Sequence, residues 1–203
     1  MLCLKEIVKG IDMTADELSA IMHERNSASL KHMQEPAPDN AQLTQIIEAA
    51  ATAPDHGRQH PFRFLVINDA GRAKLADYFE QSALRRQPDL TEELRTRARQ
   101  KAYNGPMLLA MIVAHPLEHR NIPDTDRLIS AGAALQNVLL MAQALGFASR
   151  VTSGEAVREA AFGEMLSLKS NEAFVCFISI GSSDKQRQSK GRPNASDLMR
   201  IWP

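Results

Sequence analysis

The stretch LISAGAALQNVLLMAQALGF, residues 128–147, is the longest apolar run in the chain and dominates the fold expected from the sequence. One serine, one asparagine and two glutamines interrupt the run, which favours a helix inside a globular protein over a membrane span. The pattern predicts one long helix from about Asp124 to Leu145, ended by Gly146. Because apolar residues occupy most sides of this helix, we expect it to be buried, at the centre of the fold or in a subunit interface.

Shorter elements flank the long helix on both sides. Thr14 and Glu17 fit a capping box that begins the first helix, and helical apolar spacing returns over residues 39–53, 71–87, 90–103 and 155–162. Apolar runs at residues 62–67, 107–114, 147–152 and 173–180 predict strands. The sequence therefore predicts an α+β fold with more helix than strand.

Length and composition restrict the classes of protein to which the chain can belong. Its 203 residues suit one domain, 1–203, with an N-terminal extension at 1–13 and a C-terminal arm at 182–203. The 24 basic and 24 acidic residues balance, which argues against the basic face of a nucleic-acid-binding protein. Two cysteines far apart, Cys3 and Cys176, and the lack of a secretory signal indicate a cytoplasmic protein with reduced thiols.

The segment after the first helix groups a guanidinium, an amide and two hydroxyls within five residues: Arg25, Asn26, Ser27 and Ser29. A guanidinium is well shaped to bind a phosphate through two parallel hydrogen bonds, and nearby hydroxyls can bind the remaining oxygens. The same residues also suit an ordinary helix C-terminus followed by a polar turn. The segment alone fits both interpretations.

A second polar segment joins a predicted helix to a predicted strand. Residues 53–62, APDHGRQHPF, carry Pro54, Asp55, His56 and Arg58 around a glycine. Loops held between rigid elements often carry ligand-binding groups, although an ordinary surface loop has a similar composition. The composition does not separate a binding loop from a surface loop.

Several other chemistries lack their sequence signals. Histidines four residues apart, at positions 56 and 60 and at 115 and 119, have metal-ligand spacing, but glycine or proline interrupts the helix that such a pair requires. We therefore expect no metal. The sequence contains no glycine-rich dinucleotide fingerprint, P-loop or Gly-x-Ser-x-Gly elbow. The basic tail residues Lys190 and Arg192 suit either a phosphate or plain solubility.

The order of these short motifs is more informative than any one of them. Arg-x-Ser follows the first helix, and an Ala-Pro-Asp-His loop precedes Pro-Phe and a strand. The long helix then ends in Leu-Gly-Phe, followed by a Ser-Gly turn, a strand ending in Ile-Gly, and a Lys-x-Arg-Pro tail. In this order, residues 16–193 resemble the nitroreductase family, and especially its compact subgroup that carries Ala-Pro-Asp-His.

The resemblance implies a central, mostly antiparallel sheet flanked by helices, with the long buried helix at the interface of an intertwined homodimer. It implies FMN bound between the subunits and reduced by NADH or NADPH, with a nitroaromatic, a quinone or another small molecule as electron acceptor. The resemblance implies no role for nucleic acid, membrane or metal. No catalytic acid or base is required, since the flavin carries the chemistry.

The resemblance also implies roles for particular residues. The arginine and hydroxyls after the first helix would hold the phosphate and ribityl chain, with the late basic pair beside them. The Ala-Pro-Asp-His loop would approach the flavin from the other subunit, and the Ser-Gly turn would lie beside the ring. The cofactor-binding residues implied in this way are Arg25, Asn26, Ser27, Ser29, Pro54, Asp55, His56, Arg58, Thr152, Ser153, Gly154, Lys190 and Arg192.

Three of these positions depart from the family pattern. Asn26 stands where a second arginine is common, Ser29 where a base lies near the flavin pyrimidine, and Thr152 where the compact subgroup often has arginine. The departures at Ser29 and Thr152 motivate one alternative to a reductase, a flavin-binding carrier or sensor without turnover. A third hypothesis is a structural dimer whose flavin site has decayed.

Overall fold

The computed structural model describes residues 13–115, 122–185 and 191–202. The first elements are α1 (Ala15–Glu24), the 3₁₀ turn η2 (Leu30–His32), β1 (Met33–Gln34), α2 (Asn40–Ala51) and β2 (Phe62–Val66). Next come α3 (Asp69–Arg86), α4 (Glu92–Gln100), η3 (Lys101–Tyr103) and β3 (Met107–Ala114). The last are α5 (Asp124–Ala144), β4 (Ala148–Thr152), η4 (Ala156–Arg158), α6 (Ala160–Met165), β5 (Glu172–Ser183) and α7 (Ala195–Leu198).

All the strands join one sheet in which β5 is central. The strand order is β1-β5-β3-β2, and β4 also pairs with β5. Every strand pair is antiparallel. The register of β3 on β5 shifts after Met111, which faces Cys176, because Ile112 faces Phe174 and the residue between is bulged. The expected α+β fold with a mostly antiparallel sheet is confirmed.

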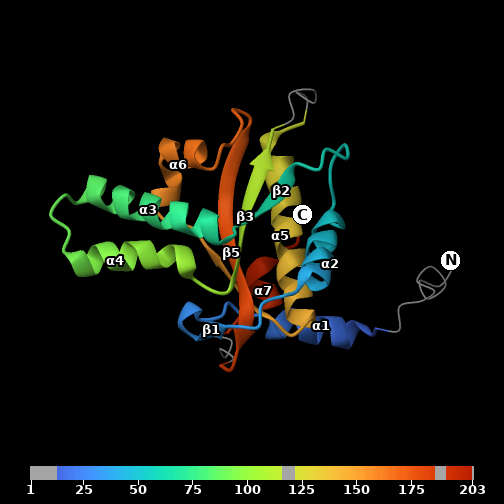
Figure 1. Cartoon of the computed structure of the whole chain (residues 1–203). Coiled ribbons are helices and arrows are strands. Elements are labelled where there is room, and N and C mark those ends of the chain that lie inside the picture. The colour runs from blue at the N-terminus through green and yellow to red at the C-terminus, as the bar shows by residue number, and fades with distance from the viewer. Residues whose placement is uncertain (1–12, 116–121, 186–190, 203) are drawn as a thin grey trace, which may run out of the picture.

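Side chains alternate between the two faces of the central strands, as a pleated sheet requires. Leu109, Met111 and Val113 of β3 pack in the cluster with α2 and α5, whereas Leu108 and Ala110 pack in the cluster with α3 and α6. Figure 1 shows the same division, with α2 and α5 on one side of the sheet and α3, α4 and α6 on the other. The sheet is therefore the middle layer of three.

Helix α5 approaches the sheet through small residues. Ala131, Ala134 and Val138 are buried against the sheet and α2. On the opposite side, Leu128 and Ile129 are 56% and 67% exposed. The expected burial of the long helix therefore holds for one face only, because the sheet and α2 cover just that side of it in a single chain.

The bare side of α5 is one of several groups of exposed apolar residues in the described parts of the chain. Another is the tail, where Leu198, Met199, Ile201 and Trp202 are 69% to 93% exposed. Scattered exposed apolar residues are normal, but groups of them usually mark an interaction site. None of the described helices is long and apolar enough to cross a membrane.

Local sequence signals explain where most elements begin. Thr14 and Asp39 cap α1 and α2, each in a reciprocal capping box with the residue three positions later. Strand β3 has the predicted bounds, and β5 runs three residues further than predicted, to Ser183. The structure also contains three short elements that the sequence pattern does not predict: η2, β1 and α7. Elements of two to four residues are too short to show periodicity.

Two carboxylates link elements that are far apart in the sequence. Glu172 at the start of β5 accepts two hydrogen bonds from Arg63 of β2, at 2.7 and 2.8 Å. Together with the backbone amide of Lys169, this arginine lowers the pKa of Glu172 to about 2. In the layer of α3 and α6, Glu159 accepts hydrogen bonds from Ser82 and other residues of α3, and its pKa is also lowered to about 2. Both carboxylates stabilise the fold only while they are ionised.

We predict that Glu172→Gln removes an acid-sensitive part of the stability. A carboxylate with a lowered pKa stabilises the folded state fully above its unfolded pKa of about 4.5 and loses this contribution as pH falls toward 2. The variant should lose about 2 kcal/mol at pH 7, after allowance for solvent around Arg63, and its stability should fall less between pH 5 and pH 2.

Urea unfolding across this pH range tests the expectation. The matched control is Glu93→Gln, which breaks the exposed Arg97–Glu93 pair on α4. Exposed pairs contribute little, so the control should behave as the wild type. An equal fall in the free energy of unfolding of wild type and Glu172→Gln between pH 5 and pH 2 would contradict the prediction.

Candidate functional site

The segment predicted to bind a phosphate runs beside the start of β4. Arg25 follows α1 in an extended conformation, with φ −62° and ψ 112°, so the chain leaves the helix along the sheet. Ser27 forms a parallel bridge with Ser149, and the amide of Ala28 donates to the Ser149 carbonyl at 2.9 Å. Residues 26–28 therefore extend the sheet beyond β4.

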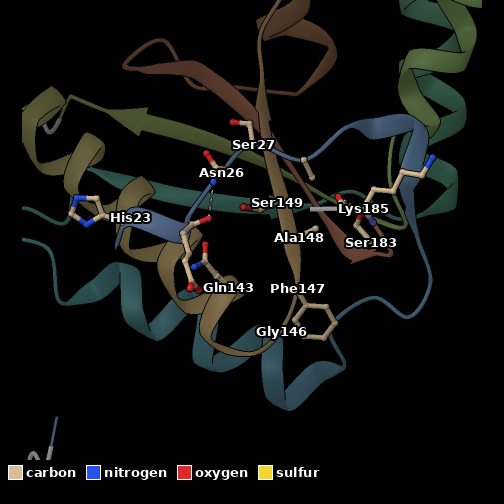
Figure 2. Close-up of a pocket in the computed structure, with 12 residues that line it drawn as sticks. His23, Asn26, Ser27, Gln143, Gly146, Phe147, Ala148, Ser149, Ser183 and Lys185 are labelled. Atoms are coloured by element: carbon tan, nitrogen blue, oxygen red, sulfur yellow. Dashed lines mark hydrogen bonds between the residues drawn. The ribbon is translucent and has the colours of Figure 1, made fainter. Parts of the chain in front are cut away.

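A pocket of about 450 Å³ opens where this segment meets the end of α5. Figure 2 shows Asn26 and Ser27 on one side of it, the turn from α5 into β4 below, and Ser183 and Lys185 on the other side. A wall rich in hydroxyl, amide and cationic groups suits an anionic ligand that accepts hydrogen bonds. The polar lining residues are His23, Glu24, Asn26, Ser27, Gln143, Ser149, Ser183 and Lys185.

Arg192 of the tail binds the end of α1 beside this pocket. Its Nη2 donates to the carbonyls of Met22, His23 and Arg25, at 3.5, 3.1 and 2.8 Å. A positive charge is stabilising at a helix C-terminus, where carbonyls lack partners. The contact places Arg192 next to Arg25, whereas Lys190 lies outside the described residues.

The predicted phosphate residues differ in how they meet the pocket. Asn26 and Ser27 line it, although the Asn26 amide turns back to donate to the Glu24 carbonyl at 2.9 Å. Arg25 flanks the pocket, and its guanidinium makes no hydrogen bond or ion pair within the described parts of the chain. Ser29 lies beyond the buried Ala28 and is not part of the lining.

Two residues that sequence reasoning missed support this end of the site. Arg150 of β4 donates from Nη1 to the Ala28 carbonyl at 3.0 Å and so holds the segment after α1 against the strand. Its Nε is buried without a partner among the residues described. Gln143 of α5 donates to the carbonyl of Ile21 at 3.0 Å and ties α1 to α5. A lone polar residue in a strand or helix carries no sequence signal for such a role.

The residues predicted to lie beside the flavin ring are at the other end of β4. Between Ser149 and Ser153 the strand advances about 13 Å, at ~3.3 Å per residue. Thr152 ends the strand opposite Phe177, and exposed Ser153 and Gly154 follow. No described atom lies within 4 Å of a Cβ built on Gly154, so the backbone is open there. β4 therefore joins a polar pocket at its start to an uncovered turn at its end.

The Ala-Pro-Asp-His loop between α2 and β2 has a defined, strained shape. Arg58 and His60 are left-handed, with φ 52° and 46°, a conformation that is costly for residues other than glycine. Asp55 Oδ2 accepts from the His60 amide at 2.6 Å, and His56 Nδ1 lies 2.7 Å from Asp126 Oδ2 at the start of α5. These contacts hold the loop against α5.

A single chain does not bring this loop to the pocket. The loop residues Pro54, Asp55, His56 and Arg58 lie by the N-terminal end of α5, whereas the pocket lies at its C-terminal end. Asp126 and Gln143, 17 positions apart in α5, are separated by about 25 Å at the helical rise of ~1.5 Å per residue. The predicted site residues therefore form two groups at opposite ends of one helix.

The site offers binding groups rather than a nucleophile or metal ligands. Burial raises the pKa of the Cys176 thiol to about 11, so this thiol is protonated at neutral pH. Across residues 13–115, 122–185 and 191–202, no three His, Cys, Asp or Glu side chains are grouped so that they could hold a metal ion. His56 and His115 instead face the carboxylates of Asp126 and Asp124.

Relatives of known sequence support the interpretation from motifs. The model of the Nitroreductase family matches residues 23–182. A Haemophilus influenzae protein named "Putative NAD(P)H nitroreductase" is 30% identical over 164 residues, which cover 81% of this chain and 88% of that protein. A Bacillus subtilis protein named "Putative NAD(P)H nitroreductase YfhC" is 28% identical over 168 residues, covering 82% and 85%.

Solved structures share the fold. A nitroreductase-like family protein from Bacillus cereus superposes with a TM-score of 0.76 at 22% identity, over 95% of this chain and 99% of that one. A Desulfovibrio desulfuricans protein solved in complex with FMN gives a TM-score of 0.69 at 23% identity, over 94% and 99%. With its sheet, its order of motifs and most of its length matched, the chain belongs to the nitroreductase family.

Proposed function

We propose that the protein is an FMN-dependent oxidoreductase that takes electrons from NADH or NADPH and passes them to a nitroaromatic, a quinone or another small acceptor. The observation that carries the proposal is the polar pocket with flanking arginines at the start of β4. The pocket lies within the fold of a family whose Desulfovibrio desulfuricans member was solved with FMN. The curated relatives carry NAD(P)H nitroreductase in their names.

The residues present fit flavin mononucleotide from its anionic end to its ring. Arg25, Lys185 and Arg192 would supply positive charge for the phosphate, and Ser27 a hydroxyl for the ribityl chain. The uncovered backbone at Gly154 leaves room for a flat ring and offers amide donors. When bound, FMN supplies hydride acceptance from the nicotinamide and transfer to the acceptor. The chain's own task is to hold and orient these partners.

A second copy of the chain would complete the site. A two-fold dimer uses the same patch on both subunits, and the exposed face of α5 around Leu128 and Ile129 is the apolar patch available for it. The exposed tail near Trp202 gives each subunit a further apolar segment to pack on its partner. In this dimer, Asp55, His56 and the rest of their loop belong to the partner's flavin site.

We predict that the purified protein is yellow and bleaches when NADPH or NADH is added without oxygen. The flavin must accept the hydride for its absorbance near 450 nm, a general property of oxidised flavins, to disappear. Yellow protein that neither nicotinamide bleaches would instead identify the carrier or sensor. Protein that binds no FMN on reconstitution would overturn the proposed function.

We predict that Arg25→Ala weakens FMN binding about 10- to 100-fold, because a hydrogen-bonded charge at a phosphate contributes about 1.5–3 kcal/mol. Quenching of FMN fluorescence during titration of the apoprotein measures the affinity. Arg97→Ala, on the solvent face of α4, is the matched control and should bind normally. Unchanged affinity in Arg25→Ala would remove this residue from the site.

We predict that Ile129→Asp gives a monomer with little bound FMN. Placing a carboxylate in the centre of an apolar interface leaves a charge buried without a partner, which opposes association. Sedimentation velocity and the flavin content of the purified variant measure both effects. Leu94→Asp, at an exposed apolar position on α4, should remain a flavin-loaded dimer. A monomeric wild type at micromolar concentration would refute the shared site.

A further inference from the structure

One histidine–carboxylate pair stands apart from the pocket and has no part in the binding of FMN phosphate. His56 Nδ1 lies 2.7 Å from Asp126 Oδ2, with the two side chains 64% and 34% exposed. The other ring nitrogen, Nε2, makes no contact within the part of the chain that the structure describes. The pair therefore presents one ring nitrogen outward while a carboxylate holds the other.

The surroundings fix the direction of this imidazole. The carbonyl of His56 accepts from Gln59 Nε2 at 3.1 Å, and Gln59 Oε1 accepts from Arg127 Nε at 3.2 Å. Asp126 and Arg127 both lie in the first turn of α5, so the ring is tied to the helix rather than to the loop alone. The carboxylate beside Nδ1 also orients the ring.

Packing of two α5 helices brings this pair to the other subunit's groove. The uncovered side of α5 includes exposed Ile129, Gly132 and Gln136, and the middle of this side lies about halfway along the helix. A two-fold axis across that point places the helices antiparallel, so that the N-terminal half of one lies over the C-terminal half of the other. The pocket and β4 lie along the C-terminal half. In its own chain the pair is about 25 Å from the pocket.

We propose that the His56–Asp126 pair of one subunit is the proton donor for the acceptor bound in the other subunit's site. This inference rests on the proposed function. The acceptor gains two electrons and one proton that originate from the nicotinamide hydride. Its second proton comes from His56, whose Nε2–H bond breaks as an O–H bond forms on the quinone or nitro oxygen. The exposed ring regains its proton from water.

The first test separates proton delivery from binding. Wild type and His56→Gln are reduced with dithionite and mixed with para-benzoquinone, which takes protons, or with ferricyanide, which takes only electrons. Glutamine can keep the hydrogen bond to Asp126 but cannot deliver a proton as an acid. With each variant saturated with FMN, we expect reoxidation by the quinone to slow about 100-fold more than reoxidation by ferricyanide. Asp126→Asn should slow the quinone in the same selective way.

Two outcomes would overturn the proposal. Equal slowing with both acceptors would show that His56 only shapes the site, and an unchanged quinone rate would show that the proton has another source. Failure of the proposed function looks different, because wild type would then bind no FMN or would not bleach with nicotinamide. If the wild type binds FMN and bleaches with nicotinamide, either of these two outcomes refutes the role of His56 and leaves the proposed function standing.

The second test places the residue without measuring activity. In protein labelled at histidine, the His56 ring signal is identified by its absence from His56→Gln. It should shift when FMN is added to the apoprotein, because the flavin is aromatic, and an unchanged signal would contradict the proposal. Mixed dimers that contain one His56→Gln subunit and one Arg25→Ala subunit should regain quinone reduction. If His56 acts across the interface, both substitutions fall in the same site and the other site is intact. If His56 acts within its own subunit, each site carries one substitution and neither is intact.

Discussion

The close packing of α5 on the sheet determines where every other part of the site can be. Small residues such as Ala131 and Ala134 let the helix axis come near the strands, and the helix then runs the length of the sheet. It ends at Gly146, whose φ of 84° permits the sharp turn into β4. The pocket follows from that turn, while the first turn of α5 holds the Ala-Pro-Asp-His loop through Asp126.

Much of the fold could be predicted because its elements carry local signals. The capping residues Thr14 and Asp39, and the unbroken apolar run of β3, mark their elements without any long-range information. β1 carries no such signal, since its two residues are held in the sheet by pairing of Met33 with Ser183, 150 positions away. The two faces of α5 could not be told apart either, because both are apolar and only the packing decides which is covered.

The residues of the candidate site also divide into those with a local sequence signal and those whose roles depend on long-range packing. Arg-x-Ser and the Ser-Gly turn could be found because they are short, ordered motifs, and the structure places them at the two ends of one strand. The position of Arg192 beside Arg25 could be inferred only from family resemblance, because 167 residues separate them. Arg150 and Gln143 could not be predicted, since their roles depend on which segment lies next to them in space. The functional roles of all these residues remain proposals.

Burial of the Cys176 thiol affects how readily peroxide can oxidise it. Reduced flavins react with oxygen to give hydrogen peroxide, and peroxide attacks cysteine chiefly as the thiolate. With its pKa raised to about 11 and its side chain enclosed by β3 and the helices, Cys176 offers peroxide almost no thiolate and little access. A reductase built on this core would withstand the oxidant that its own idle turnover in air generates.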